Sequence, residues 1–247
     1  KDVKYIKGVG PSRVQLLNKI GIFTLKDLIT YYPRDYQDRS KPKELYECYD
    51  GEEATIEVVA TSRLTDTRLK NKKTIQKLQV RDESAVATIT WFNQSYLKSK
   101  FEIGKKYRFY GKINNKYGRI EINSPVFDEI EKKNNTGKII PIYPLTYQLT
   151  QNTIRKIIEN GLEEVNKQGG LKETLPQYLL EEYNLENINQ ATQDIHFPKE
   201  FENFKTARNR LVFEELLSTQ LALLQLKNNN LTEKKGIVFD KNVKMSD

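Results

Sequence analysis

The chain has 247 residues, with 37% hydrophobic and 30% charged side chains and a net charge of +8, which suits one large domain or two small ones with their own cores. Its one Cys (Cys48) and one His (His196) exclude an intramolecular disulfide, a zinc site built from the usual ligands and a Cys-His nucleophile pair. No apolar stretch approaches the roughly 20 residues that span a bilayer, and the opening residues, KDVKY, lack the apolar core of a signal peptide. We therefore expect a cytoplasmic protein without a membrane partner.

The positive charge is concentrated in one quarter of the chain. Residues 61–120 hold fifteen Lys and Arg against four Asp and Glu, so this segment carries +11 and the remainder about −3. Concentrated positive charge is typical of a protein that binds a polyphosphate, because neutralising phosphates releases counterions. The alternative is a solvated basic face that binds nothing in particular.

Residues 1–50 are predicted to be helical. Apolar residues at helical spacing fill 14–20, and Gly21 follows as a helix stop. A further helix is expected to begin at the N-cap Thr24 and to end at Tyr32, because Pro33 cannot continue it.

The turn GVGP at 8–11 resembles a helix-hairpin-helix element. The backbone N–H groups of Gly8 and Gly10 could then contact a phosphate. The two glycines could equally form a tight turn between helices and bind nothing.

Residues 51–130 are predicted to form strands. Five runs rich in β-branched and aromatic residues are separated by polar or Gly-containing turns, at 54–64, 74–82, 85–92, 107–114 and 118–123. Alternation places one set of side chains inside, Leu78, Val80, Tyr107, Phe109 and Ile113, and another outside, Lys77, Gln79, Arg81, Arg108, Tyr110 and Lys112. With a brief helix at 93–100, this element order predicts a five-stranded OB-fold barrel in an α+β protein with helical segments on either side.

Residues 131–247 begin with a polar break at 131–138 and then turn helical. Helices are expected near 153–167, 176–183 and 204–227, with the last ending at the three Asn residues 228–230. The last helix is too apolar for a solvent-exposed helix, so it needs a partner surface. The tail, 231–247, is too short and polar to form a domain.

The stretch TWFNQSY at 90–96 places three large rings beside the predicted end of a strand. If Trp91 points into the barrel, Phe92 points out, Asn93 can cap the following helix, and Tyr96 falls on its first turn. Rings beside a basic groove let bases stack, at about 1–3 kcal/mol per base. Alternatively, Phe92 could be a hydrophobic staple against Leu97, with Tyr96 covering the barrel end.

The sequence holds no recognisable catalytic motif. The phosphate-binding patterns GxxxxGK[ST] and GxGxxG and the nucleophile elbow GxSxG are all missing. His196 is expected to be structural. No catalytic residue and no metal site is therefore predicted.

Several segments resemble the N-terminal half of the RecG family of ATP-dependent DNA helicases. They are IKGVGPSRVQLLNKIGIFTLKDLITYYPRDYQDRS, WFNQSYL, IIPIYPLT and IHFPKEFENFKTARNRLVFEELLSTQLALL, in the family's order and at compatible spacing. The resemblance covers nearly the whole chain. Its most specific parts are the block at 8–11 and a C-terminal set, His196, Phe197, Pro198, Ala207, Arg210, Leu211, Glu214, Glu215, Leu216 and Gln220. One departure is Tyr147-Gln148, where the family is expected to have Glu-Gly, so a tight turn there is not assured.

The resemblance implies a wedge domain, an OB-fold that splits the arms of a replication fork or Holliday junction while a C-terminal motor pulls duplex DNA. Two wedge aromatics four residues apart cap the last base pairs in that family, and Phe92 and Tyr96 match their spacing. The helix after the wedge leads to the motor. Motor motifs are not found in these residues, so ATP and Mg²⁺ are expected only for motor domains, and this chain alone should neither hydrolyse ATP nor unwind DNA.

The division expected from this reading is a helical segment at 1–50, an OB-fold wedge at 51–130 and a helical linker region at 131–247. We expect a monomer that acts in recombination and repair at the bacterial nucleoid. Contacts to DNA backbones are expected from Lys70, Lys72, Lys73, Lys77, Arg81, Lys98, Arg108, Lys112, Lys116 and Arg119. The alternatives are a stand-alone OB-fold protein for single-stranded DNA or RNA, and a scaffold that docks a protein.

Overall fold

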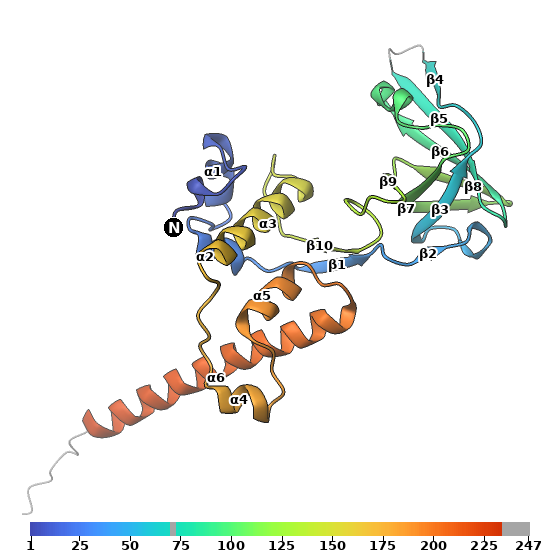
Figure 1. Ribbon diagram of the computed structural model, residues 1–247. Helices are drawn as coiled ribbons and strands as arrows, with labels where there is room; N and C mark the ends of the chain where they lie inside the picture. Colours follow the sequence, from blue (N-terminus) through green and yellow to red (C-terminus); the bar gives the residue numbers. More distant parts are fainter. Residues whose placement is uncertain (70–72, 234–247) are drawn as a thin grey trace, which may run out of the picture.

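A computed structural model describes residues 1–69 and 73–233 of the chain. A β-barrel lies at one end and a group of helices at the other, with two paired strands running between them (Figure 1). The long C-terminal helix extends from the helical group away from the barrel (Figure 1). In residues 1–69 and 73–233, no helix combines the length and the apolar character needed to cross a membrane.

The barrel is a closed ring of five strands: β3 (Glu53–Ala60), β5 (Thr74–Arg81), β6 (Val86–Phe92), β8 (Arg119–Asn123) and β7 (Lys106–Lys116). The ring closes because β7 pairs with β3, and every pairing in it is antiparallel except that of β6 with β8. Three shorter strands extend it: β2 (Pro42–Lys43), β4 (Thr65–Arg68) and β9 (Val126–Glu129). The predicted OB-fold barrel within an α+β protein is confirmed.

The interior of the barrel follows the predicted alternation. Leu78, Val80, Tyr107, Phe109 and Ile113 are all fully buried. Trp91 is 1% exposed, and its indole N–H donates to the carbonyl oxygen of Pro125 at 3.3 Å. Because each strand has one apolar face, the pleat decides which side chains reach the barrel core. Tyr110, predicted to lie outside, is only 8% exposed, because Arg39 lies over its ring.

The barrel strands differ from prediction mainly at polar or irregular segments. The run at 54–64 was expected to be one strand, but β3 ends at Ala60 while Leu64 remains buried in the core. Leu64 therefore still points into the barrel core, although it lies beyond the last residue of β3. The strand β4 reads TDTR with all four residues exposed, so it has no hydrophobic alternation that would reveal it.

The N-terminal segment contains less helix than predicted. It has a 3-10 turn, η1 (Val3–Tyr5), and two short helices, α1 (Pro11–Asn18) and α2 (Leu25–Ile29). The expected cap at Thr24 is confirmed, since its hydroxyl accepts from the backbone N–H of Asp27 at 3.2 Å and the Asp27 carboxylate accepts from Thr24 N–H at 2.9 Å. The helix ends at Ile29, with Thr30 as its C-cap, three residues before the predicted end at Tyr32. Pro33 disfavours helical backbone at Tyr32 itself.

Two strands outside the barrel were not predicted. The strand β1 (Asp35–Asp38) pairs antiparallel with β10 (Ile139–Ile142), with Tyr36 opposite Pro141. A 3-10 turn, η2 (Leu45–Glu47), then leads into the barrel. The sequence of β1 is DYQD, which looks like a loop, and a proline within β10 is tolerated because a two-stranded ribbon has free edges.

Up to Glu233, the C-terminal region contains four helices: α3 (Gln151–Lys167), α4 (Gln177–Glu182), α5 (Ile188–His196) and α6 (Phe201–Glu233). The helix α5 was not predicted. The expected end of the last helix at residues 228–230 is wrong, since α6 continues to Glu233. Asn lowers helix propensity by less than about 1 kcal/mol per residue, which does not by itself end a helix.

His196 fastens α5 to two other segments, and its predicted structural role is confirmed. Its Nε2–H donates to the carbonyl oxygen of Ile29 at 2.8 Å, and its Nδ1 accepts from the hydroxyl of Tyr143 at 2.9 Å. The carbonyl can only accept, which fixes this tautomer. Burial lowers the pKa of His196 to about 4, against the opposing effect of the Ile29 hydrogen bond. The ring is therefore neutral at pH 7.

The N-terminal helices and α3 share one core. This core joins Leu17, Leu25 and Leu28 to Ile154 and Ile158, while the barrel has its own. At Gly161 of α3, an added Cβ would lie 2.7 Å from Leu28 Cδ2, so the glycine allows α2 and α3 to approach closely. The first and third predicted segments are thus joined by packing, and the boundaries at 50 and 130 stay predictions.

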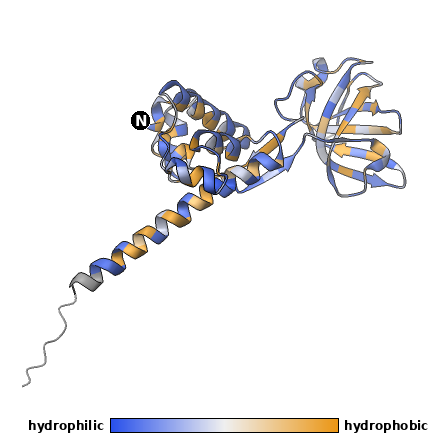
Figure 2. Cartoon of the chain, turned by 60° about the horizontal axis from the view of Figure 1, so that its bottom comes forward, coloured by the Kyte–Doolittle hydropathy of each residue, from blue (hydrophilic) through white to orange (hydrophobic). Residues whose placement is uncertain are grey.

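Only part of the apolar surface of α6 is buried within the structure. Ala207 is buried against α5, whereas Leu216, Leu221, Leu224 and Leu226 are more than half exposed. Figure 2 shows apolar residues recurring along the part of the helix that projects from the molecule. The predicted need for a partner surface therefore remains.

Candidate nucleic-acid interface

Phe92 and Tyr96 both lie on the surface at one end of the barrel. Phe92 is the last residue of β6 and is 49% exposed, while Tyr96, in the 3-10 turn η3 (Ser95–Ser99), is 68% exposed. Trp91, between them in sequence, is buried. The outward placement of both rings agrees with the sequence prediction.

The staple alternative does not fit this geometry. The N-cap residue of η3 is Gln94, so Phe92 is not the residue directly before the cap. Leu97 is buried in the barrel core, and Phe92 is not among the side chains packed against that core. Tyr96 is too exposed to cover the barrel end.

Asn93 has a different role from the predicted helix cap, and that prediction is wrong. Its φ of 55° lies in the left-handed region, which Asn tolerates better than most residues. Its backbone N–H donates to Thr74 O at 2.8 Å, and its side-chain oxygen accepts from Thr74 N–H at 3.0 Å. Asn93 therefore ties the turn between the rings to the start of β5.

Gln76 completes this attachment from inside the barrel wall. It is fully buried, and its side-chain N–H₂ donates to Asp66 Oδ1 at 2.7 Å, Thr74 Oγ1 at 2.8 Å and Ser95 Oγ at 3.2 Å. Its side-chain oxygen accepts from the backbone N–H of Gln94 at 2.9 Å. One amide thus joins the β4 strand to the turn that separates the two rings.

Sequence reasoning missed Gln76, although a signal was present. The alternation that places Leu78 and Val80 inside also places Gln76 inside. A buried polar side chain needs hydrogen-bond partners, so an inward-facing Gln near a strand end indicates that it bonds to neighbouring segments.

The basic residues predicted to contact DNA do not form one patch. Lys73, Lys77 and Lys98 are exposed and belong to the segments around the rings, the start of β5 and η3. Arg81 lies at the far end of β5. The remaining exposed ones, Lys112, Lys116 and Arg119, lie on β7 and β8, across the barrel from β5 or at its opposite end. Lys70 and Lys72 fall outside the described residues.

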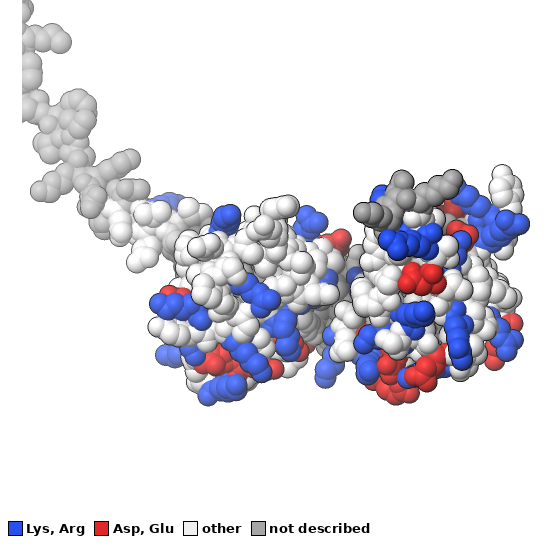
Figure 3. All heavy atoms as spheres, turned by 90° about the horizontal axis from the view of Figure 1, so that it is seen from above, with Lys and Arg blue, Asp and Glu red and all other residues white. Residues whose placement is uncertain are grey.

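Figure 3 shows the molecule from above Figure 1, the side on which the β4–β5 hairpin lies, with Lys and Arg side chains spread over the barrel and Asp and Glu among them. On this face, acidic side chains therefore interrupt the positive charge of the barrel. Among the predicted contact residues that the structure describes, Lys73, Lys77 and Lys98 belong to the segments nearest the ring pair.

Arg108 is not available to DNA, and its predicted backbone contact is wrong. It is 7% exposed, and its Nε and Nη2 donate to Glu57 Oε1 at 2.9 and 2.6 Å. The loop that follows β9 covers it, since a Cβ added at Gly137 would lie 2.4 Å from Arg108 Nη1. Burial opposes ionisation of Glu57, but Arg108 and Lys106 outweigh it and lower the pKa of Glu57. Arg108 therefore forms an ion pair within the protein.

The segment directly before the turn at 8–11 is the 3-10 turn η1, where a helix-hairpin-helix element would have an α-helix. Gly8 has a φ of +87°, and its carbonyl oxygen accepts from Arg13 Nη1 at 2.6 Å. Gly10 is the N-cap residue of α1. The turn is tied to α3, because Asn160 Nδ2 donates to Lys7 O at 2.6 Å. Phosphate contact at Gly8 or Gly10 stays a prediction.

The turn at Tyr147 and Gln148 forms without the glycine expected from the family. Gln148 adopts a φ of 73°, and Leu149 N–H donates to Thr146 O at 3.2 Å. The left-handed position that glycine would occupy is therefore filled by a glutamine.

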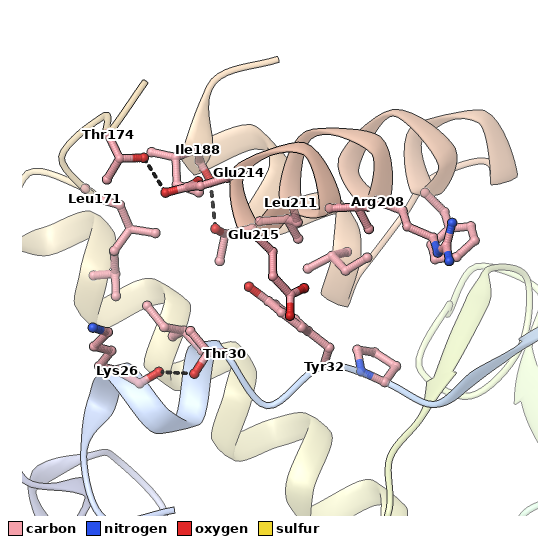
Figure 4. A pocket seen from close by; sticks show the side chains of 18 of the residues that line it. Lys26, Thr30, Tyr32, Leu171, Thr174, Ile188, Arg208, Leu211, Glu214 and Glu215 are labelled. Atoms are coloured by element: carbon pink, nitrogen blue, oxygen red, sulfur yellow. Dashed lines mark hydrogen bonds between the residues drawn. The ribbon is translucent and has the colours of Figure 1, made fainter. Parts of the chain in front are cut away.

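A pocket of about 1150 Å³ lies at the helical end of the molecule, between α2, the segment after α3, and α6. Figure 4 shows Tyr32 and Glu215 projecting into it from facing elements. Burial and the charges of Glu214 and Glu215 raise the pKa of Tyr32. None of the predicted site residues that the structure describes lines this pocket. Within the same described ranges, no group of three or more His, Cys, Asp or Glu side chains could hold a metal ion.

Comparisons with known proteins identify relatives over almost the whole chain. The family described as the RecG wedge domain matches residues 2–165. An ATP-dependent DNA helicase RecG from Thermotoga maritima is 36% identical over 241 residues, covering 95% of this chain and 30% of that protein. The Streptococcus pneumoniae protein of the same name is 29% identical over 242 residues, covering 95% of this chain and 34% of its own.

Among solved structures, one described as RecG bound to a three-way DNA junction superposes with a TM-score of 0.82 at 35% sequence identity. The match covers 93% of this chain and 31% of that one. The chain thus spans about a third of the length of the relatives it matches.

Proposed function

Because this chain belongs to the RecG wedge domain family, we propose that it is the branched-DNA-binding part of a RecG-like ATP-dependent DNA helicase that acts in recombination and repair. Its substrates would be replication forks and Holliday junctions, in the bacterial cytoplasm at the nucleoid. The proposal is supported by the superposition, with a TM-score of 0.82, on a structure described as RecG bound to a three-way DNA junction.

The observation that carries the proposal is the exposure of Phe92 and Tyr96 beside the buried Trp91. An aromatic ring in water costs free energy unless a partner covers it, and unpaired or terminal bases offer flat apolar faces. Each stacked base would contribute about 1–3 kcal/mol. The rings would cap the last base pairs where two strands separate.

The turn between the rings is suited to this role because it is held rigidly. Asn93 and Gln76 attach it to β5 through four hydrogen bonds of 2.8–3.2 Å. A pre-ordered site loses less conformational entropy on binding, so more of the stacking energy appears as affinity.

The cations around the ring pair would hold the backbones of the separated strands. Lys73, Lys77 and Lys98 are exposed there. Lysines at a phosphate backbone add affinity without reading sequence, so we expect little sequence preference. Lys70 and Lys72, which are close to Lys73 in the sequence, would act with them.

The exposed apolar surface of α6 would dock the motor domains of the parent protein. Leu216, Leu221, Leu224 and Leu226 are more than half exposed, and the relatives are about three times as long as the match. ATP and Mg²⁺ would bind in those motor domains, and the wedge part would act as a monomer.

The proposal is tested by titrating the 247-residue chain with a three-way junction, a plain duplex and a single strand at two salt concentrations. We expect the junction to bind best, and all binding to weaken by orders of magnitude from low to moderate salt. Tight binding to an unbranched single strand without junction preference would favour a stand-alone OB-fold protein. Binding whose affinity does not change with salt concentration would favour a protein-docking scaffold.

A further inference from the structure

The β7–β8 hairpin ends in an unusual tip. Lys116 pairs with Arg119, leaving a two-residue loop of Tyr117 and Gly118 with φ values of 53° and 74°. Loops of this kind strongly favour Asn-Gly, because both central residues need a positive φ. Here an aromatic residue occupies the first position.

Folding does not explain a tyrosine at this position. The left-handed backbone costs a residue other than glycine roughly 1–2 kcal/mol. Tyr117 is also the most exposed large hydrophobic side chain in the described part of the chain, at 104% relative exposure. Packing of the ring therefore contributes no stability that could offset the cost of the left-handed backbone.

The charges around the tip suit an anionic partner only in part. Lys116 and Arg119 are exposed on either side of the ring. Glu121 is exposed two residues further along β8, and the Asp50 carboxylate accepts from the backbone N–H of Asn115 at 2.9 Å. Because the net positive charge is small, the ring itself must provide most of any affinity.

The tip lies at the opposite end of the barrel from Phe92. The strand β8 runs parallel to β6, with Ile120 opposite Ala87, so Tyr117 lies beyond the start of β6 while Phe92 ends it. Along the strand direction, Tyr117 and Phe92 are therefore eight residues apart, or about 26 Å at ~3.3 Å per residue.

The surface between these ends has the composition of a strand-binding face. In OB-folds, the second and third strands and the loop between the fourth and fifth bind oligonucleotides. These are β5, β6 and the β7–β8 tip here. Lys77, Gln79 and Arg81 form an exposed row along β5, and Thr88 lies beside Gln79 on β6, donating to it at 3.2 Å.

We propose that Tyr117, flanked by Lys116 and Arg119, is a second stacking site, which holds an unpaired DNA strand after it leaves Phe92 and Tyr96 and follows the outer face of β5 and β6. This rests on the proposed junction-binding function. The site takes bases of any sequence, because every base has a flat π-face.

The test uses the 247-residue chain and two three-way junctions that differ only in the length of one unpaired arm. One arm has two nucleotides, shorter than the smallest OB-fold site of about 4, and the other has about 12, within the usual range. Tyr117→Asn removes the ring and suits the left-handed backbone, so its melting temperature should equal or exceed that of the wild type. Tyr117→Phe keeps the ring. Tyr147→Ala removes an exposed tyrosine outside the barrel as a matched control.

We expect Tyr117→Asn to weaken binding of the long-armed junction about fivefold or more and to leave the short-armed junction unchanged. Tyr117→Phe and Tyr147→Ala should bind both like the wild type. Equal binding of the long arm by Tyr117→Asn and the wild type, or equal losses on both arms, would overturn the inference. The short-armed junction with Phe92→Ala and Tyr96→Ala tests the proposed function separately, because that arm cannot reach Tyr117.

Discussion

The side-chain oxygen of Gln76 accepts a hydrogen bond from the backbone N–H of Gln94 at 2.9 Å, so a fully buried amide in the barrel wall holds the turn between two exposed aromatic rings. The same amide donates to Asp66 on β4. The position of the ring pair and that of the β4–β5 hairpin are therefore linked through one side chain.

Replacing Gln76 with Leu should disturb both. The change leaves four polar partners without their bonds, which we expect to cost about 1–3 kcal/mol of the free energy of unfolding. Junction binding should weaken more than duplex binding, because the rings lose their fixed separation. Urea unfolding and parallel titrations measure the two effects.

The matched control for that change is Gln15→Leu, at an exposed glutamine of α1 outside the barrel. It should alter stability by less than about 0.5 kcal/mol. If Gln76→Leu unfolds more easily yet keeps its full preference for junctions, Gln76 has only a structural role.

Arg108→Ala should act on stability. Removing Arg108 takes away two hydrogen bonds to Glu57 and leaves that carboxylate with Lys106, at 3.5 Å, as its remaining cation, which we expect to cost about 1–3 kcal/mol. The salt dependence of DNA binding, measured on the folded variant, should match that of the wild type. A shallower salt dependence would mean that Arg108 reaches phosphate after all.

Lys77→Ala should show the opposite behaviour. Lys77 is exposed beside the ring pair and takes part in no ion pair found among the described residues. Its loss should leave the unfolding free energy within about 0.5 kcal/mol and reduce the slope of log K against log salt by about 1. An unchanged slope would remove Lys77 from the interface.

His196 should make the stability of the helical end depend on pH. Burial lowers its folded pKa to about 4 from an ordinary value of 6.5, so the unfolded chain takes up the proton first as the pH falls. Stability from this group is complete above about pH 6.5 and is lost toward pH 4, by about 3 kcal/mol in total. Urea unfolding between pH 7.5 and pH 4 measures the loss.

The comparison variant for this loss is His196→Gln, which cannot take up a proton. It should be less stable at pH 7 but should lack the additional slope between pH 6.5 and 4. Identical slopes in both proteins would show that His196 does not titrate in this window.

The sequence predicted the parts of the fold that a repeating apolar pattern specifies. Leu78, Val80 and Trp91 alternate with polar residues on strands, which places them in a barrel core without further information. Thr24 followed by Asp27 is similarly a local signal for a helix start.

Elements stabilised by distant partners could not be predicted in this way. The strand β1 is polar and exists because β10, a hundred residues later, pairs with it. Arg108 alternates outward as predicted, but a loop from elsewhere in the chain covers it. Tyr117 falls between two predicted strand runs, and nothing in the sequence pattern predicts its left-handed backbone or its full exposure.

The most direct test of the central claim is the double change Phe92→Ala and Tyr96→Ala, titrated against a three-way junction and a plain duplex at the same salt concentration. Because both rings are exposed, the melting temperature should fall by no more than one or two degrees. We predict that junction affinity drops at least tenfold, as expected for the loss of two stacked bases, while duplex affinity stays nearly constant. An equal loss on both substrates, or no loss on the junction, would contradict the account.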